Sequence, residues 1–179
     1  MVYHPLKKRL SFFMILNYQD LKLLLQKIKN RLIQASFASF EETDVKKWVI
    51  TFKKDRYEYL IISLVPIVRF NLLKKKPKAV KTPFCQEIEK ILKKQTLLSL
   101  SLLNNDRILK IEFESNSLII ELFPRKNNLY LVNKNDKILL SYYPVEKQFY
   151  SVPLKKTAIE EASHLKDEKN IESFLEHLQ

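Results

Sequence analysis

The chain contains no glycine among its 179 residues. Phosphate-binding loops of the Walker and dinucleotide types depend on glycine, so nucleotide sites of both types are excluded. The turns between strands must instead be built from Asn, Asp, Ser and Pro, the other residues that tolerate turn conformations.

Cysteine and histidine are also scarce. The single cysteine, Cys85, excludes a disulfide within the chain and any zinc site made of cysteine ligands. The three histidines stand at positions 4, 164 and 177, too scattered to predict a transition-metal site. We therefore expect a protein without a metal ion or another cofactor.

Long hydrophobic runs are missing as well. No segment reaches the roughly 18 apolar residues that a membrane-spanning helix needs. The apolar run at 11–16 follows a basic triplet at 7–9, but it is too short for a secretion signal and has no small-residue cleavage site. We expect a soluble, cytoplasmic protein that does not bind a membrane.

Positive charge, in contrast, is abundant. Lys and Arg number 32 against 20 Asp and Glu, which gives a net charge of +12. A basic surface favours a polyanionic partner because neutralised phosphates release counterions, although a solvated lysine-rich surface has the same composition. The densest positive segment, 74–81, predicts an exposed loop and a generic phosphate contact.

Hydrophobic periodicity predicts two helices in the body of the chain, at 18–33 and 83–94. Short apolar segments between polar breaks predict nine strands: 36–41, 48–53, 57–64, 67–73, 96–103, 107–114, 118–123, 128–132 and 137–143. Strand runs after each helix indicate an α+β fold, an antiparallel, sandwich-like domain over 17–153. We expect 1–16 to be an N-terminal extension and 154–179 to form short C-terminal helices.

An acid–base pair, Asp106-Arg107, stands at the entrance of the strand predicted at 107–114. Arg107 suits a bidentate contact to phosphate or a stack on a base. Asp106 would orient Arg107 or accept a hydrogen bond from a base or a 2′-hydroxyl group. The structural alternative is that Asp106 simply forms the turn at the strand entrance.

Three segments together resemble one family. The segment 82–90 (TPFCQEIEK) is similar to a P-x-F-C-x-x-L-R-K helix, 105–113 (NDRILKIEF) to a strand beginning G-x-D-R-I-V, and 119–132 to I-I-E-L-x-G-R-x-S-N-I-I-L-T. Over most of 17–145 the chain therefore resembles the N-terminal domain of the NFACT family, which includes fibronectin-binding protein A-like proteins, RqcH and NEMF. That domain also resembles the N-terminal sandwich of formamidopyrimidine-DNA glycosylases.

The resemblance implies a noncatalytic module of ribosome-associated quality control that binds tRNA, the large ribosomal subunit, or both. Family residues needed for tRNA function fall on Asp20, Asp106 and Arg107, although Asp20 also suits a helix N-terminus. The nucleic-acid-binding residues that we predict are Asp20, Arg69, Lys74, Lys75, Lys76, Lys78, Lys81, Asp106, Arg107, Arg125, Lys126 and Asn128.

The chain departs from the family pattern in places. Asn104 or Asn105 and Pro124 replace family glycines, and Glu89 replaces an arginine, a charge reversal expected to weaken RNA contact. The family's coiled coil and C-terminal domain lie outside the resemblance, so we expect a separate protein to supply them. The alternatives are a degenerate or split paralogue that acts as a protein-interaction scaffold, a fibronectin-binding-type protein, and a glycosylase-type enzyme. For the last, no Met-Pro-Glu sequence occurs.

Overall fold

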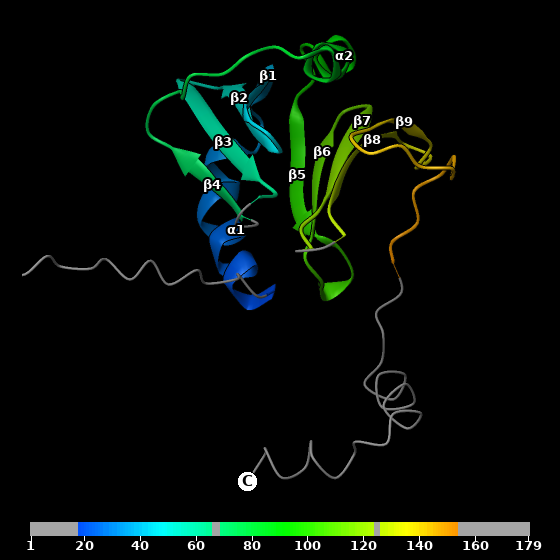
Figure 1. The fold of residues 1–179 in the computed structure, drawn as a ribbon. Helices are drawn as coiled ribbons and strands as arrows, with labels where there is room; N and C mark the ends of the chain where they lie inside the picture. The colour runs from blue at the N-terminus through cyan, green and yellow to red at the C-terminus, as the bar shows by residue number, and fades with distance from the viewer. Residues whose placement is uncertain (1–17, 66–68, 124–125, 154–179) are drawn as a thin grey trace, which may run out of the picture.

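The computed structural model describes residues 18–65, 69–123 and 126–153, which form two facing sheets with a helix at each side (Figure 1). The predicted N-terminal extension and C-terminal helices lie outside these residues. The elements in chain order are α1 (Tyr18–Leu32), β1 (Ser36–Asp44), β2 (Lys47–Lys53), β3 (Tyr57–Ser63), β4 (Arg69–Leu73), α2 (Pro83–Leu92), β5 (Leu97–Leu102), the short 3₁₀ helix η1 (Leu103–Asn105), β6 (Ile108–Phe113), β7 (Asn116–Glu121), β8 (Asn128–Asn133) and β9 (Ile138–Ser141).

Both sheets are antiparallel meanders in which each strand pairs with its neighbour in sequence. Their strand orders are β1-β2-β3-β4 and β5-β6-β7-β8-β9. Short polar turns favour this topology because antiparallel neighbours need no crossover connection. The predicted α+β fold with antiparallel sheets is therefore confirmed.

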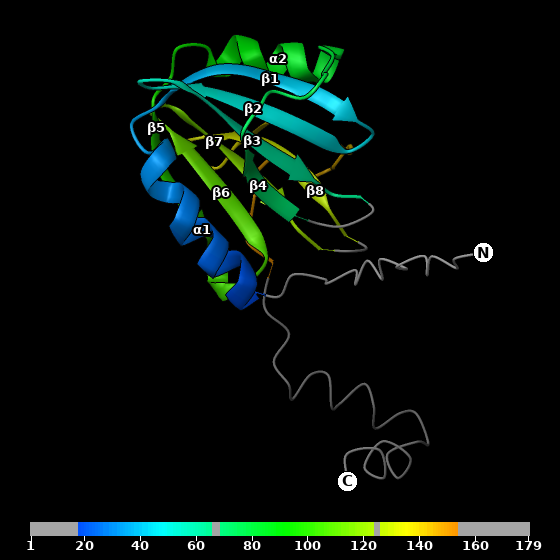
Figure 2. The ribbon, with the colours of Figure 1, turned by 90° about the vertical axis from the view of Figure 1, so that its left-hand side faces the viewer.

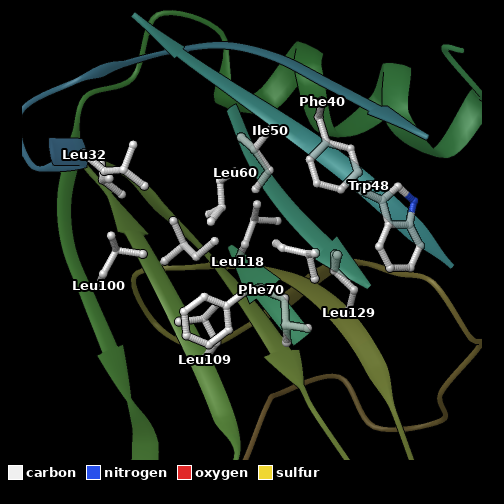
Figure 3. Close-up of a cluster of buried hydrophobic side chains, with 14 of the residues drawn as sticks. Leu32, Phe40, Trp48, Ile50, Leu60, Phe70, Leu100, Leu109, Leu118 and Leu129 are labelled. Atoms are coloured by element: carbon white, nitrogen blue, oxygen red, sulfur yellow. The ribbon is translucent and has the colours of Figure 1, made fainter. Parts of the chain in front are cut away.

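The main hydrophobic core lies between the two sheets (Figure 3). Each strand turns alternate side chains inward, and the buried ones come from both sheets. Burying each such side chain stabilises the fold by about 1.5–3 kcal/mol. The labelled core residues of Figure 3 are Leu32, Phe40, Trp48, Ile50, Leu60, Phe70, Leu100, Leu109, Leu118 and Leu129.

The two sheets join along one side through the main chain. The Gln34 amide donates to the carbonyl of Leu97 at 2.9 Å, and the Leu97 amide donates to the carbonyl of Ala35 at 2.9 Å. The start of β1 is thus bonded to the start of β5, a non-local pairing that no local sequence pattern predicts. Helix α1 packs along this side, where it contacts both β4 and β5 (Figure 2).

The outer face of the five-stranded sheet is covered too. A second cluster of buried side chains lies there and comprises Ile108, Ile119, Tyr130, Val132 and Tyr150. Because both faces of β7 are covered, every residue of that strand is buried. The segment predicted as a strand at 118–123 therefore does not alternate between apolar and polar residues, as a strand with one solvent-exposed face would.

Without glycine, the chain makes its left-handed turns with larger residues. Six described residues have a positive φ angle: Gln34, Lys46, Lys94, Asn104, Asn105 and Asp136. The predicted use of Asn and Asp accounts for three of them. The left-handed conformation costs most residues about 1–2 kcal/mol each, while Asn and Asp tolerate it better.

Helix α2 begins as its sequence indicates. The Thr82 hydroxyl accepts a hydrogen bond from the Cys85 amide, and Pro83 occupies the first helical position. Ile88 and Leu92 are buried against the first sheet. Cys85 is fully buried, and burial raises the pKa of its thiol.

Candidate nucleic-acid interface

The turn that leads into β6 is made by two consecutive asparagines. Asn104 has φ 51° and Asn105 has φ 49°, so both adopt the left-handed conformation. The family pattern has a glycine at one of these two positions. Because asparagine tolerates this conformation better than most residues, the turn is retained without glycine.

Asp106 supports the backbone of this turn. Its carboxylate oxygen Oδ1 accepts a hydrogen bond from the Arg107 amide at 2.7 Å, and its own amide donates to the Leu103 carbonyl at 2.9 Å. Asp106 therefore bonds the main chain of Arg107, and its carboxylate performs the turn-forming role that the sequence left as an alternative. The second carboxylate oxygen remains as an acceptor.

The side chain of Arg107 is half-buried and stacks on an aromatic ring. Its guanidinium carbon lies 5.5 Å from the centre of the Phe123 ring, and Phe123 packs against the second hydrophobic cluster. The Arg107 carbonyl accepts from the Leu122 amide at 2.8 Å, which fixes the backbone. Across 18–65, 69–123 and 126–153, no carboxylate forms an ion pair with this guanidinium.

Helix α1 brings Asp20 to the same turn. The Tyr18 hydroxyl donates to Oδ1 of Asn105 at 3.1 Å, which holds the first turn of α1 against η1. Asp20 is half-buried in that first turn, where a carboxylate is favoured by the helix dipole. The first turn of α1, which contains Asp20, therefore lies against the turn whose Asn105 directly precedes Asp106 and Arg107 in the sequence.

Arg69 and Asn128 hold different positions. Arg69 begins β4, opposite Ser63 of β3. Asn128 is buried, and its amide group bonds both the carbonyl and the amide of Tyr143, at 3.2 and 2.9 Å. These bonds occupy the Asn128 side chain in holding the chain beyond β9. Lys126 is exposed in the β7–β8 connection, and Arg125 lies outside the described residues.

The segment 74–81 lies away from this turn. Figure 1 shows it leaving β4 and passing over the top of the sandwich to α2, whereas η1 and the start of α1 lie at the bottom. Its backbone pairs with the edge of β1, since the amides of Val80 and Glu42 each donate to the other's carbonyl, at 2.8 and 2.9 Å. The predicted basic residues are thus divided between two regions.

Acidic neighbours neutralise part of this segment. Lys76 forms an ion pair with Glu41, and Lys81 forms one with Glu89 at 2.7 Å. Burial alone would raise the pKa of Glu41, but hydrogen bonds from Lys76 and Ser39 outweigh burial and lower it. The hydrogen bond to Glu89 raises the pKa of Lys81. Lys74, Lys75 and Lys78 are exposed and form no ion pair with an acid in the part of the chain that the structure describes.

A buried acid that the sequence did not single out lies on the outer face of β7. The Glu121 carboxylate accepts hydrogen bonds from the hydroxyls of Tyr150 at 3.2 Å and Tyr130 at 3.4 Å. The Lys147 ammonium lies 4.7 Å from the Tyr150 ring centre. Burial raises the pKa of Glu121 despite these partners. The cluster holds the segment after β9 against the sheet beside Ile108, the residue that follows Arg107.

Comparisons with known proteins agree with this fold. A family model described as NFACT N-terminal and middle domains matches residues 18–152. A search of the curated proteins finds no match. Among the described residues, no helix has the length and apolar character required to cross a membrane.

Three solved structures are similar to this chain. The N-terminal domain of fibronectin-binding protein PavA from Streptococcus pneumoniae has a TM-score of 0.71 and 18% identity, over 88% of this chain and 76% of that one. The fibrinogen binding protein from Staphylococcus aureus has a TM-score of 0.68 and 19% identity, over 81% of this chain and 58% of that one. The N-terminal part of the fibronectin/fibrinogen-binding protein from Streptococcus suis has a TM-score of 0.70 and 18% identity, over 79% and 62%. At these identities the likeness establishes the fold.

Proposed function

Because the chain belongs to the family of NFACT N-terminal and middle domains, as its motifs predicted, we propose that it is a noncatalytic RNA-binding module that binds tRNA. Its setting is cytoplasmic ribosome-associated quality control, with the large ribosomal subunit as the second partner. This chain spans 76%, 58% and 62% of the three similar structures. A separate protein that carries the family's coiled coil and C-terminal domain is proposed as a further partner.

The observation that carries the proposal is the state of Arg107. Arg107 is half-buried, its guanidinium lies over the Phe123 ring, and no acid among the described residues forms an ion pair with it. Arginine in this state can donate two parallel hydrogen bonds to a phosphate or extend a stack of bases. Asp106 fixes the backbone and keeps one carboxylate oxygen for a 2′-hydroxyl, the group that distinguishes RNA from DNA.

The experiment is tRNA binding by fluorescence anisotropy, with wild-type protein and the Arg107→Ala variant. A hydrogen bond to a charged group contributes about 1.5–3 kcal/mol, so we expect affinity to fall about tenfold or more. Arg107→Lys keeps the charge and loses the bidentate geometry, and should bind with intermediate affinity. Lys134→Ala, an exposed lysine in the β8–β9 turn, is the matched control. Equal affinity of the Arg107→Ala and wild-type proteins would contradict the proposed site.

A second candidate function comes from the names of the similar structures, which describe fibronectin- and fibrinogen-binding proteins. Immobilised fibronectin and fibrinogen therefore belong in the same assay series. Saturable binding that Arg107→Ala leaves unchanged, together with no tRNA binding, would favour this second function over the first.

A further inference from the structure

A charged pocket lies on the four-stranded sheet at the far end of α1 from the Asp106 turn. It is formed where the last turn of α1 meets the β2–β3 hairpin, and its volume is about 410 Å³. Since a water molecule occupies about 30 Å³, it has room for a phosphate group with several waters. Its lining residues are Asn30, Arg31, Lys54, Asp55, Arg56 and Glu58.

A buried carboxylate organises the two arginines of this pocket. Glu58 is 5% exposed, and each of its oxygens accepts a bond from a different guanidinium. Oε2 accepts from Nη2 of Arg31 at 2.5 Å, and Oε1 accepts from Nε of Arg56 at 2.9 Å. Each arginine uses one nitrogen on Glu58 and keeps further N–H donors, because a guanidinium carries five. Glu58 therefore holds both arginines in place and leaves donors for an anion.

The charge of the pocket favours an anion. Three cations line it against two acids, Asp55 and Glu58. The last carbonyls of a helix carry partial negative charge, which would oppose an anion. Here the Lys54 ammonium donates to the carbonyl of Ile33 at 3.1 Å, directly after α1, and offsets that charge. The pocket is polar and charged, unlike the apolar pockets that bind drug-like molecules.

The exposed face of α1 connects the pocket to the Asp106 turn. The helix has 15 residues, so it spans about 22 Å between the two. It carries Lys22, Lys27 and Lys29 on exposed positions, in addition to Arg31. An RNA backbone that contacts Arg107 would therefore pass these cations along the helix before it reaches the pocket.

We infer that this pocket binds a backbone phosphate of the same RNA that contacts Arg107, so that RNA lies along α1. The inference rests on the proposed function and extends it by naming a second contact and the path between the two. Arginines fixed by a buried carboxylate bind phosphate with little loss of side-chain freedom. The contact is to the backbone, so it adds affinity and orientation and no sequence preference.

The test uses the Lys54→Gln/Arg56→Gln double variant, which leaves the Arg31–Glu58 ion pair intact and so protects the fold. Binding of tRNA is measured between 50 and 200 mM salt. Losing this phosphate contact should reduce the slope of log affinity against log salt by about 0.9, which makes the affinity loss over that range about 3.5-fold smaller. The Lys134→Gln/Lys137→Gln variant, with the same charge change in the β8–β9 turn, should keep the wild-type slope.

The outcomes of these measurements distinguish the pocket from the proposed function. An unchanged slope in the Lys54→Gln/Arg56→Gln variant, with binding still lost in Arg107→Ala, overturns the pocket alone. Absence of tRNA binding by the wild-type protein overturns the proposed function and the pocket together. Equal slope changes in the double variant and its control show general charge attraction and also overturn the pocket.

Discussion

Replacing Asn105 with alanine should destabilise the protein by about 2 kcal/mol. Two effects of about 1 kcal/mol each add up to this loss of stability. Alanine is strained at the φ angle of 49° that Asn105 adopts, and the hydrogen bond that Asn105 accepts from Tyr18 disappears. Asn105→Gly keeps the turn conformation free of strain and loses only the hydrogen bond, so it should cost about 1 kcal/mol or less.

The free energy of unfolding is measured by urea denaturation for Asn105→Ala, Asn105→Gly and Tyr18→Phe. Tyr18→Phe removes the same hydrogen bond from the other side, so the double variant Tyr18→Phe/Asn105→Gly should be no less stable than the less stable single variant. Because the turn positions Arg107, the Asn105→Ala variant should bind tRNA more weakly than the Asn105→Gly variant. If alanine and glycine at position 105 destabilise the protein equally, the left-handed turn does not limit stability and the reasoning is wrong.

Two further predictions concern buried or paired acids. Because the pKa of Glu121 is raised in the folded protein, its ionisation opposes folding, so the stability of the wild type should decline as pH rises through that pKa. Glu121→Gln should remove this decline, as measured by denaturation at several pH values. Glu89→Gln should release Lys81 and raise tRNA affinity, at a stability loss of about 1 kcal/mol or less because Lys81 is half-exposed. Unchanged affinity would show that Lys81 faces no RNA.

The helices and strands could be predicted because their signals are local. Helix α2 has its threonine cap and its proline at the first position, and β6 alternates buried and half-exposed residues over its central positions. The predicted break at 42–47 was too long, since β1 continues to Asp44 and β2 begins at Lys47. A lysine with a positive φ angle, Lys46, closes this tight turn, and lysine is not a residue that signals one.

Non-local contacts account for what the sequence could not predict. The bonds between the start of β1 and the start of β5 join residues about 60 positions apart, and backbone pairing leaves no trace in side-chain pattern. Glu121 lies in a segment that resembles the family, yet only its contacts with Tyr130 and Tyr150 show that it is buried among hydroxyls. The motif at 104–107, in contrast, placed Arg107 correctly at a strand entrance.

Ion pairs reduce the free charge of the most basic segment in the sequence. The segment 74–81 is the densest run of lysines, but Lys76 and Lys81 are held by Glu41 and Glu89, so its free charge is smaller than its sequence suggests. Glu89 also accepts a hydrogen bond from the Phe40 amide of edge strand β1 at 3.0 Å, so this acid has a structural role as well. A lysine that is paired with an internal acid must break that ion pair before it binds a phosphate. It strengthens RNA binding only if the new contact is more favourable than the ion pair it replaces. The unneutralised arginine at position 107 and the lysines of α1 therefore favour RNA contact along α1 more strongly than at the lysine segment.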